Sequence, residues 1–208
     1  MEEKIQETRK IICVGPKFKA FREQSGIALE AEPTFLLKSP ESLVTGEYIS
    51  LSPKLDTFIC EVEMAVVIGK DATEISETDA LNHVAGYALA NDISASSYVN
   101  DGRFKMFDHT TPIGPFVTGI DPSQVTLEMR VNNSLVQRDH TRELSYSVPW
   151  LISHLSSIMT LRRGDILLTG TPANPHPCDF GDVIELTSPQ LGYYKHTIRK
   201  KRSGISSL

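Results

Sequence analysis

The sequence predicts a strand-rich α+β domain with a few helices packed outside its sheets. Ten segments have the length and the apolar, β-branched or aromatic content of strands, whereas three segments are typical of helices. The strands do not alternate regularly with helices, which argues against a doubly wound parallel sheet. The 208 residues suffice for one large domain. We place it at residues 11–200, between an N-terminal extension (1–10) and a flexible tail (201–208).

Four strands and two helices are predicted in the first part of the chain. The strands span residues 11–14, 35–38, 48–51 and 58–68. The first helix, over residues 17–25, is short and ends at a glycine. The second, over residues 77–85, follows Ser76, which has Asp79 at the spacing of a capping box, and it ends at Gly86.

Six strands and one helix are predicted in the remainder. The strands span residues 87–93, 125–131, 134–137, 165–169, 183–187 and 193–199. Asn132 and Asn133 form a tight hairpin between two of them, because asparagine tolerates positive φ. The helix over residues 148–159 has Ser147 as its cap and Pro149 in its first turn, where a missing N–H costs nothing.

The composition is that of an ordinary globular protein and excludes several classes of function. The formal net charge of −5 gives no sign of a nucleic-acid-binding surface, and no apolar run reaches membrane-spanning length. Cys13, Cys60 and Cys178 are an odd set without paired spacing, which argues for a reducing compartment. The N-terminus shows no apolar segment typical of a signal peptide. These observations predict a cytoplasmic protein without nucleic-acid or membrane partners.

Two glutamates interrupt the most strand-like run of the chain. Glu61 and Glu63 lie two residues apart within residues 58–69, so in a strand both side chains project from the same face. Two buried carboxylates repel each other, and the arrangement requires a cation, a proton or basic side chains to offset the charge. Fixed carboxylate oxygens suit Mg²⁺, Mn²⁺ or Ca²⁺ better than zinc. The alternative is an edge strand whose glutamate face is wet.

Three further features are candidates for the same site. Asp92 follows a small, apolar run, and a strand end could bring a third carboxylate to the two glutamates; the alternative is a turn cap. Lys105 could neutralise that charge or hold a developing oxyanion, unless it is a surface lysine. The bend that contains Gly170 and Thr171 follows a predicted buried strand, and it offers hydroxyls and backbone N–H groups to a carboxylate.

The histidines provide no metal motif. Their spacing matches no zinc-binding pattern, and the sequence has no phosphate-binding loop or nucleophile elbow. His154 falls among apolar residues of a predicted helix and is expected to be structural. His109 and His176 lie near the motifs above and are weak candidates for acid–base chemistry.

Taken in order, these motifs resemble the fumarylacetoacetate hydrolase family. The resemblance runs from residue 11 to about residue 198. The matching segments are Ile11-Ile-Cys-Val-Gly15, Phe35-Leu-Leu-Lys38, Glu61-Val-Glu-Met-Ala-Val-Val-Ile-Gly-Lys70, Ala85-Gly-Tyr-Ala-Leu-Ala-Asn-Asp92, Lys105-Met-Phe-Asp108, Pro112-Ile-Gly-Pro115, Val131-Asn-Asn with Gln137, Leu161-Arg-Arg-Gly-Asp165 and Thr169-Gly-Thr-Pro172.

The resemblance implies a mixed β-roll with a few peripheral helices, usually assembled as a homodimer. It implies a divalent ion, Mg²⁺ before Mn²⁺ or Ca²⁺, held at the positions of Glu61, Glu63 and Asp92. Lys105 matches a family lysine beside the metal, and Thr171 matches a threonine that contacts substrate. Members of the family hydrolyse C–C bonds of small 2-oxo or β-diketo acids, decarboxylate them, or isomerise their enol and keto forms.

The departures from the family pattern concern activity. The lid motif Tyr-x-x-His-x-x-Glu reads Phe18, Phe21 and Gln24 here, so the residues that normally activate water are absent. The arginine after the metal aspartate is Ser96, and residues 173–177 replace a glycine-rich stretch. Because general-base assistance contributes roughly 100- to 10,000-fold, we expect hydrolysis to suffer more than isomerisation, tautomerisation or decarboxylation. Two alternatives stay open: an inactive metal-, ligand- or partner-binding member, and a subunit that requires a catalytic paralogue.

Overall fold

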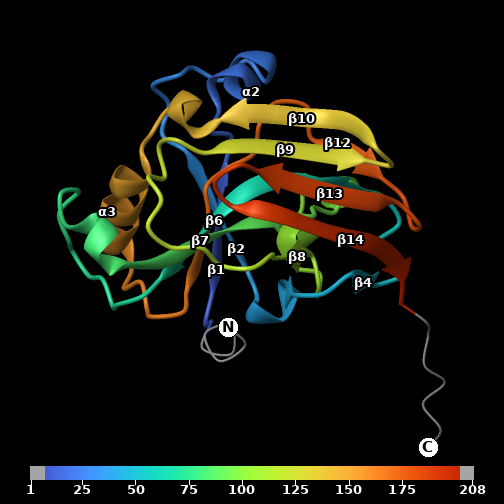
Figure 1. Cartoon of the computed structure of the whole chain (residues 1–208), viewed down its shortest axis with the longest axis horizontal. Coiled ribbons are helices and arrows are strands. Elements are labelled where there is room, and N and C mark those ends of the chain that lie inside the picture. Colours follow the sequence, from blue (N-terminus) through green and yellow to red (C-terminus); the bar gives the residue numbers. More distant parts are fainter. Residues whose placement is uncertain (1–7, 202–208) are drawn as a thin grey trace, which may run out of the picture.

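Two five-stranded mixed sheets form the body of the computed structural model, which describes residues 8–201 (Figure 1). The first sheet has the order β2-β1-β11-β6-β7, with β1 at Ile11–Gly15, β2 at Thr34–Lys38, β6 at Val62–Ile68, β7 at Val84–Asn91 and β11 at Ile166–Leu168. The second has the order β10-β9-β13-β14-β4, with β4 at Tyr48–Leu51, β9 at Thr126–Val131, β10 at Ser134–His140, β13 at Val183–Ser188 and β14 at Gly192–Lys200. One neighbouring pair in each sheet is parallel, β1 with β11 and β4 with β14. This architecture confirms the predicted strand-rich α+β class.

The main core lies between the two sheets. Met64 and Leu89 from the first sheet and Leu127, Met129 and Leu186 from the second all belong to one buried apolar cluster. This arrangement follows from the strand period of two, because alternate residues of each central strand face the opposite sheet. The other face of the first sheet carries a second, smaller apolar cluster, and this is the face on which the candidate site lies.

Within residues 8–201, two α-helices lie outside the sheets. The helix α2 (Lys19–Gln24) follows β1, and α3 (Val148–Ile158) packs at one end of the sheets (Figure 1). Ser147 caps α3 by accepting a hydrogen bond from the Trp150 N–H at 3.1 Å, which confirms the predicted start. No described helix has both the length and the apolar character needed to cross a membrane.

The helix predicted over residues 77–85 is wrong. Only a short 3-10 helix, η2 (Ala80–His83), follows Ser76 before β7 begins. Gly86 does not end a helix. It lies inside β7, where a Cβ would come within 2.7 Å of the Val117 carbonyl oxygen. The glycine is therefore explained by the close approach of the Val117 backbone to β7, and local sequence does not reveal this contact.

The strand predicted over residues 58–68 is interrupted at Glu61. It forms β5 (Phe58–Cys60), which pairs with β12 (His176–Cys178), and then β6 in the first sheet. Neither β12 nor the pair of β3 (Leu43–Val44) with β8 (Thr111–Pro112) was predicted. The predicted hairpin is confirmed, since both of its asparagines have positive φ.

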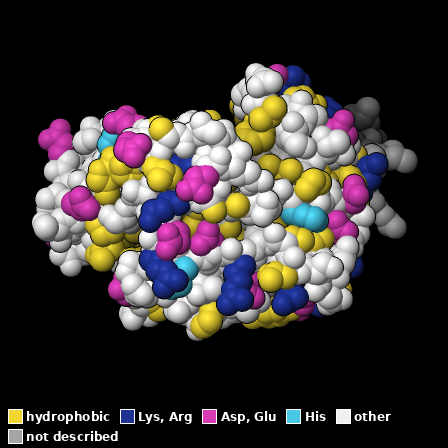
Figure 2. All heavy atoms as spheres, turned by 90° about the horizontal axis from the view of Figure 1, so that it is seen from above, with side chains coloured by type: hydrophobic (Ala, Val, Ile, Leu, Met, Phe, Trp, Pro, Cys, Tyr) yellow, Lys and Arg dark blue, Asp and Glu magenta, His cyan; other side chains and the backbone are white. Residues whose placement is uncertain are grey.

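The predicted extension and tail fall almost entirely outside the described residues, which begin at residue 8 and end at residue 201. Acidic and basic side chains are intermixed on the face seen in Figure 2, with hydrophobic areas between them.

Candidate active site

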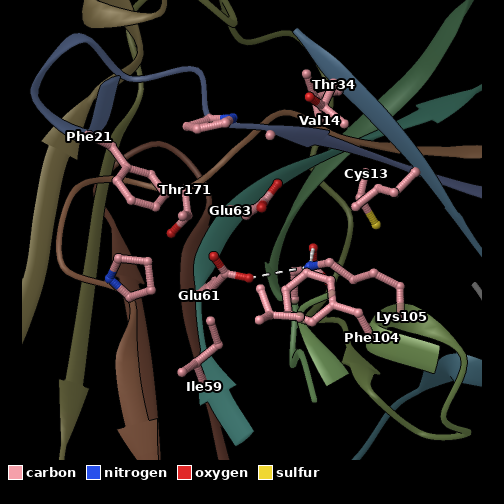
Figure 3. A pocket seen from close by; sticks show the side chains of 16 residues that line it. Cys13, Val14, Phe21, Thr34, Ile59, Glu61, Glu63, Phe104, Lys105 and Thr171 are labelled. Atoms are coloured by element: carbon pink, nitrogen blue, oxygen red, sulfur yellow. Dashed lines mark hydrogen bonds and ion pairs between the residues drawn. The ribbon is translucent and has the colours of Figure 1, made fainter. Parts of the chain in front are cut away.

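A cavity of about 350 Å³ brings five predicted site residues together (Figure 3). Glu61, Glu63, Asp92, Lys105 and Thr171 all line it, although they come from three distant parts of the sequence. The remaining wall is contributed by β1, α2, β2 and β5, and by the loop and 3-10 residues Pro16, Val99, Phe104 and Pro175. The sixth predicted residue reaches the cavity wall through its backbone, as described below.

The strand period explains why the glutamates can face a cavity. In β6 the side chains of Met64 and Val66 enter the main core, whereas Ala65 and Val67 belong to the cluster on the opposite face. Glu63 shares this second face, as the alternation requires. Glu61 and Glu63 point into the cavity in Figure 3, and they are 7% and 3% exposed. The alternative of a wet edge strand is therefore wrong, since β6 lies between β11 and β7.

Two lysines contact Asp92 from both sides. Lys38 Nζ lies 2.6 Å from Oδ1 of this aspartate, and Lys105 Nζ lies 2.6 Å from Oδ2. Lys105 Nζ also lies 3.3 Å from Glu61 Oε2 and contacts the Ser94 hydroxyl. That hydroxyl donates to the same oxygen of Glu61 at 2.9 Å. Lys105 is therefore a buried ion-pair partner, and the alternative of a surface lysine is wrong.

Lys38 was not predicted as a site residue. It ends β2, its side chain is fully buried, and its Nζ also donates to the backbone oxygens of Ile93 and Thr110 at 3.0 and 2.7 Å. The signal in the sequence was a lysine at the end of an apolar strand. The lysine reaches Asp92 only because β2 pairs with β1. A lysine at the end of an apolar strand does not by itself indicate a site residue.

Burial and mutual repulsion determine the charge of the carboxylates. Burial raises the pKa of Glu63 well above its ordinary value, and the charges of Asp92 and Glu61 raise it further. Burial also raises the pKa of Glu61, against the opposing effect of Lys105. The pKa of Asp92 would likewise rise with burial, but Lys105 and Lys38 lower it to about 2. The charge of Asp92 is thus offset by two lysines, whereas no lysine within the described residues forms an ion pair with Glu63.

Gly170 contacts Glu63 through its backbone. Its N–H donates to Glu63 Oε2 at 2.6 Å. Gly170 has φ +97°, and a Cβ at this position would lie 2.8 Å from Lys17 Cβ. The glycine is required both by its conformation and by the space available.

Thr171 is held by a residue that sequence reasoning did not assign to the site. Gln137 Nε2 donates to Thr171 Oγ1 and to the Pro172 carbonyl, each at 3.0 Å. Its Oε1 accepts from the Val62 N–H at 2.9 Å, between the two glutamates. Gln137 thereby ties the bend to the start of β6. A glutamine in a strand gives no local sign of this position.

The chemistry of the donor set fits a hard divalent cation. Glu61, Glu63 and Asp92 outnumber Lys38 and Lys105, so with every group ionised the buried cluster would carry one unbalanced negative charge, which a bound cation would offset. However, no three His, Cys, Asp or Glu side chains within residues 8–201 are placed as ligands of one ion, and the Lys105 ammonium contacts two of the three carboxylates. The predicted ligand roles therefore stay predictions.

The candidate histidines do not line this cavity. His109 has φ +59°, and its Nδ1 lies 3.0 Å from the Ser50 carbonyl oxygen. His176 lies in β12, beside Cys60. His154 stacks on Trp150 and Phe35, with ring centroids 4.5 and 5.5 Å away, and these contacts are compatible with the expected structural role.

The three lid-motif positions have separate environments. Phe18 is fully buried in the main core, whereas Phe21 lines the cavity. Gln24, at the end of α2, exchanges hydrogen bonds with Asn174: its Nε2 donates to Oδ1 at 3.1 Å, and its Oε1 accepts from the backbone N–H at 3.3 Å. Ser96 lies in η3 (Ser96–Tyr98) and does not line the cavity.

Comparisons with known proteins agree on one family. Residues 10–199 match the family model described as fumarylacetoacetate (FAA) hydrolase, C-terminal. The chain is 34% identical over 209 residues to a mitochondrial oxaloacetate tautomerase of Arabidopsis thaliana, covering 95% of this chain and 94% of that protein. Among solved structures, 5-carboxymethyl-2-hydroxymuconate delta-isomerase from Mycobacterium smegmatis is 32% identical with a TM-score of 0.86, covering 94% of this chain and 80% of that one. Fumarylpyruvate hydrolase from Pseudomonas aeruginosa, in complex with Mn²⁺ and pyruvate, is 26% identical with a TM-score of 0.86, covering 93% and 91%.

Proposed function

Because this chain belongs to the fumarylacetoacetate hydrolase family, we propose that it is a divalent-metal-dependent enzyme acting on small 2-oxo or β-diketo acids. One observation carries the proposal: three buried carboxylates line one cavity together with Lys105, and within the described residues only one further buried lysine, Lys38, contacts this acidic group from behind the wall. We propose Glu61, Glu63 and Asp92 as the ligands, and Mg²⁺ as the ion. The Mn²⁺ in the Pseudomonas relative supports a divalent ion, and Mn²⁺ or Ca²⁺ are alternatives.

The ion would supply a Lewis acid that polarises the carbonyl of a bound 2-oxo acid and stabilises an enolate. The residues of this chain would supply a positive charge, an oriented hydroxyl and an apolar surface. Lys105 holds positive charge at the wall, since Asp92 and Glu61 raise its pKa against the effect of burial. Thr171 presents a hydroxyl that Gln137 orients. The side chains of Phe21 and Phe104 add apolar surface to the cavity wall.

Among the reactions of such acids, we propose isomerisation, tautomerisation or decarboxylation ahead of C–C hydrolysis. No histidine is found among the described residues that line the cavity, and Phe21 lines it at the motif position where the family pattern has a histidine. An apolar ring cannot accept a proton from water. Tautomerisation and decarboxylation require only an electron sink and a proton source.

Turnover of a substrate panel tests this proposal. The panel contains acylpyruvates, oxaloacetate and hydroxy-diene-dioates, each with Mg²⁺, Mn²⁺ or Ca²⁺. We expect turnover that falls about 100-fold or more in a Glu61→Gln, Glu63→Gln double variant. The matched control is Glu30→Gln with Glu32→Gln, because these two glutamates are exposed and do not line the cavity. Equal turnover in wild type and the site double variant would reject the chemistry.

A second function is an inactive member that binds a metal and a ligand. Phe21 at the cavity and the contact of Lys105 with two of the proposed ligands favour it. This alternative predicts a raised Tm with Mg²⁺ plus oxalate, but consumption of no compound in the panel. If the chain is instead a subunit of a catalytic paralogue, it should co-purify with a second chain.

We also propose a homodimer. Leu37 on the edge strand β2 is 53% exposed, and Met106, after the neighbouring 3-10 helix η4 (Gly102–Lys105), is 66% exposed. A second copy of the chain would cover these apolar side chains. Light scattering should give twice the chain mass, and Met106→Glu should reduce it. Leu135→Glu, at a leucine that is 45% exposed on β10, is the control.

We propose a cytoplasmic location. It is supported by three free cysteines, all buried, which a reducing compartment favours. Fluorescence microscopy of the full chain with a C-terminal tag tests it, and a mitochondrial signal would overturn it.

A further inference from the structure

The cavity wall consists of one group of charged side chains and a larger apolar part. Its acidic and basic side chains are Glu61, Glu63, Asp92 and Lys105, all described above as one buried group. Most of the remaining side chains are apolar: Phe21, Leu36, Ile59, Val99, Phe104 and Pro175. In Figure 3, Phe21, Ile59 and Phe104 lie on different sides of Glu61. A ligand whose oxygens reach the acidic cluster must therefore place the rest of its body against apolar surface.

A second carboxylate on such a ligand would need a cation or several donors. Lys105 is the only basic side chain among the described residues of the wall, and Asp92 and Glu61 already contact it. Lys38 lies behind the wall, fully buried and bound to Asp92. Neither lysine is therefore available for a second anionic group.

The other basic residues near the cavity are also engaged. Lys17 follows the wall residue Pro16, but its Nζ is buried and lies 3.9 Å from the centroid of the Tyr146 ring. Arg22 follows Phe21, but its guanidinium donates to three backbone carbonyls.

Arg103 precedes Phe104 in the wall, but its side chain is directed elsewhere. Its Nε and Nη2 donate to both oxygens of Asp101 at 3.0 and 2.6 Å, and its guanidinium lies 4.3 Å from the centroid of the Tyr98 ring. The position at which the family pattern has an arginine is Ser96, outside the wall.

We propose that the substrate is a 2-oxo acid with one carboxylate, whose remaining part is an uncharged alkyl or aryl group. This inference rests on the proposed function and narrows its substrate class. The apolar wall stabilises an alkyl or aryl group by burying it, whereas a second carboxylate would lose its hydration without a partner and would face three acidic side chains. The relatives named for oxaloacetate and fumarylpyruvate act on acids with two carboxylates, so the chain would differ from them in this respect.

Two matched ligand pairs test the inference. Butyrylpyruvate and succinylpyruvate differ only in ending with a methyl or a carboxylate, and their kcat/KM values compare turnover. The pair 2-oxohexanoate and 2-oxoadipate has the same difference but no cleavable 4-oxo group, and calorimetry compares the Kd values. In the presence of Mg²⁺ we expect the methyl-ended member of each pair to be favoured about tenfold or more.

A charge introduced at the cavity wall sharpens the test. Val99 is 62% exposed and contributes to the wall. Val99→Lys should shift the ratio of the two Kd values toward 2-oxoadipate by about tenfold, whereas Val99→Gln, of similar length and neutral, should shift it much less.

The outcomes separate this inference from the proposed function. If either member of a pair binds or turns over, the proposed function survives, and the ratio decides the inference. Preference for the carboxylate-ended member overturns the inference alone, as does an equal ratio in wild type, Val99→Lys and Val99→Gln. If no ligand of either kind binds or reacts, both the function and the inference fail.

Discussion

The two faces of strand β6 are buried to the same degree, but they differ in chemistry: one packs apolar side chains, and the other carries a carboxylate. Met64 and Val66 enter the core between the sheets, where apolar contacts decide the fit. Glu63, which directly precedes Met64 in the sequence, has its side chain on the opposite face, where it lines a cavity with charged walls. The comparison teaches that burial alone does not reveal the role of a residue. The core face serves stability, whereas the cavity face has a charge that the fold alone does not balance.

The largest effect should come from placing a charge on the core face. Val66→Asp would bury a carboxylate in the main core, where no cation is available among its apolar neighbours. We expect a loss of roughly 4 kcal/mol or more in the free energy of unfolding, measured by urea denaturation. Val66→Ala is the control and should cost less. A Val66→Asp protein as stable as Val66→Ala would contradict the difference between the faces.

The next largest loss of stability should come from Gly170, whose backbone N–H contacts Glu63 on the cavity face. Gly170→Ala would force a Cβ against Lys17 Cβ at 2.8 Å and hold alanine at φ +97°. We expect a cost of about 1–3 kcal/mol in stability and weaker binding of 2-oxo acids, because the N–H of this residue donates to Glu63. Gly181→Ala, at φ +106° with open space around it, measures the conformational cost alone.

Removing the carboxylate of Glu63 should increase the free energy of unfolding, in contrast to the two substitutions above. Glu63→Gln keeps an acceptor for the Gly170 N–H but removes the carboxylate whose pKa burial raises. In the presence of EDTA we expect the variant to be more stable than wild type by about 1–2 kcal/mol. Mg²⁺ should raise the Tm of wild type and not that of the variant. A destabilised variant in EDTA would show that the charge is balanced within the fold.

An effect of similar size concerns Lys17, a buried lysine with aromatic neighbours and no hydrogen-bond acceptor in the described structure. Burial lowers its pKa to about 7, with a further contribution from Arg22. Between this value and the ordinary pKa of lysine the unfolded chain binds the extra proton, so stability should rise with pH in this range. Relative to Lys17→Met, we expect wild type to gain about 1–2 kcal/mol from pH 7 to pH 9 in urea denaturation. Parallel curves for the two proteins would disprove the shifted pKa.

Much of the fold could be predicted from local sequence, since alternation and capping are local signals. Helix α3 begins at the serine that caps it, and the Asn132–Asn133 hairpin lies where positive φ is tolerated. The helix predicted over residues 77–85 failed because Gly86 responds to a distant backbone segment. Spacing alone also could not reveal that the strand run breaks at Glu61.

The candidate site divides in the same way. The strand period explains the face on which Glu63 lies in β6, whereas Glu61 faces the same cavity from the break between β5 and β6. Family motifs indicated Asp92, Lys105 and Thr171. The roles of Lys38 and Gln137 depend on pairings across 54 and 75 residues of sequence, which no local pattern contains. The contact of Lys105 with two of the proposed ligands could not be predicted either, because it depends on side-chain placement in the folded protein.

The amide pair between Gln24 and Asn174 has a consequence for two segments of the cavity wall. It joins α2, which contributes Phe21 to the wall, to the segment that contributes Pro175. Both partners are neutral, so dissolved ions do not screen the contact, and no proton uptake breaks it. The Gln24–Asn174 contact itself should therefore keep the same stability at low and high salt, and at acidic pH values that would protonate a glutamate in the place of Gln24.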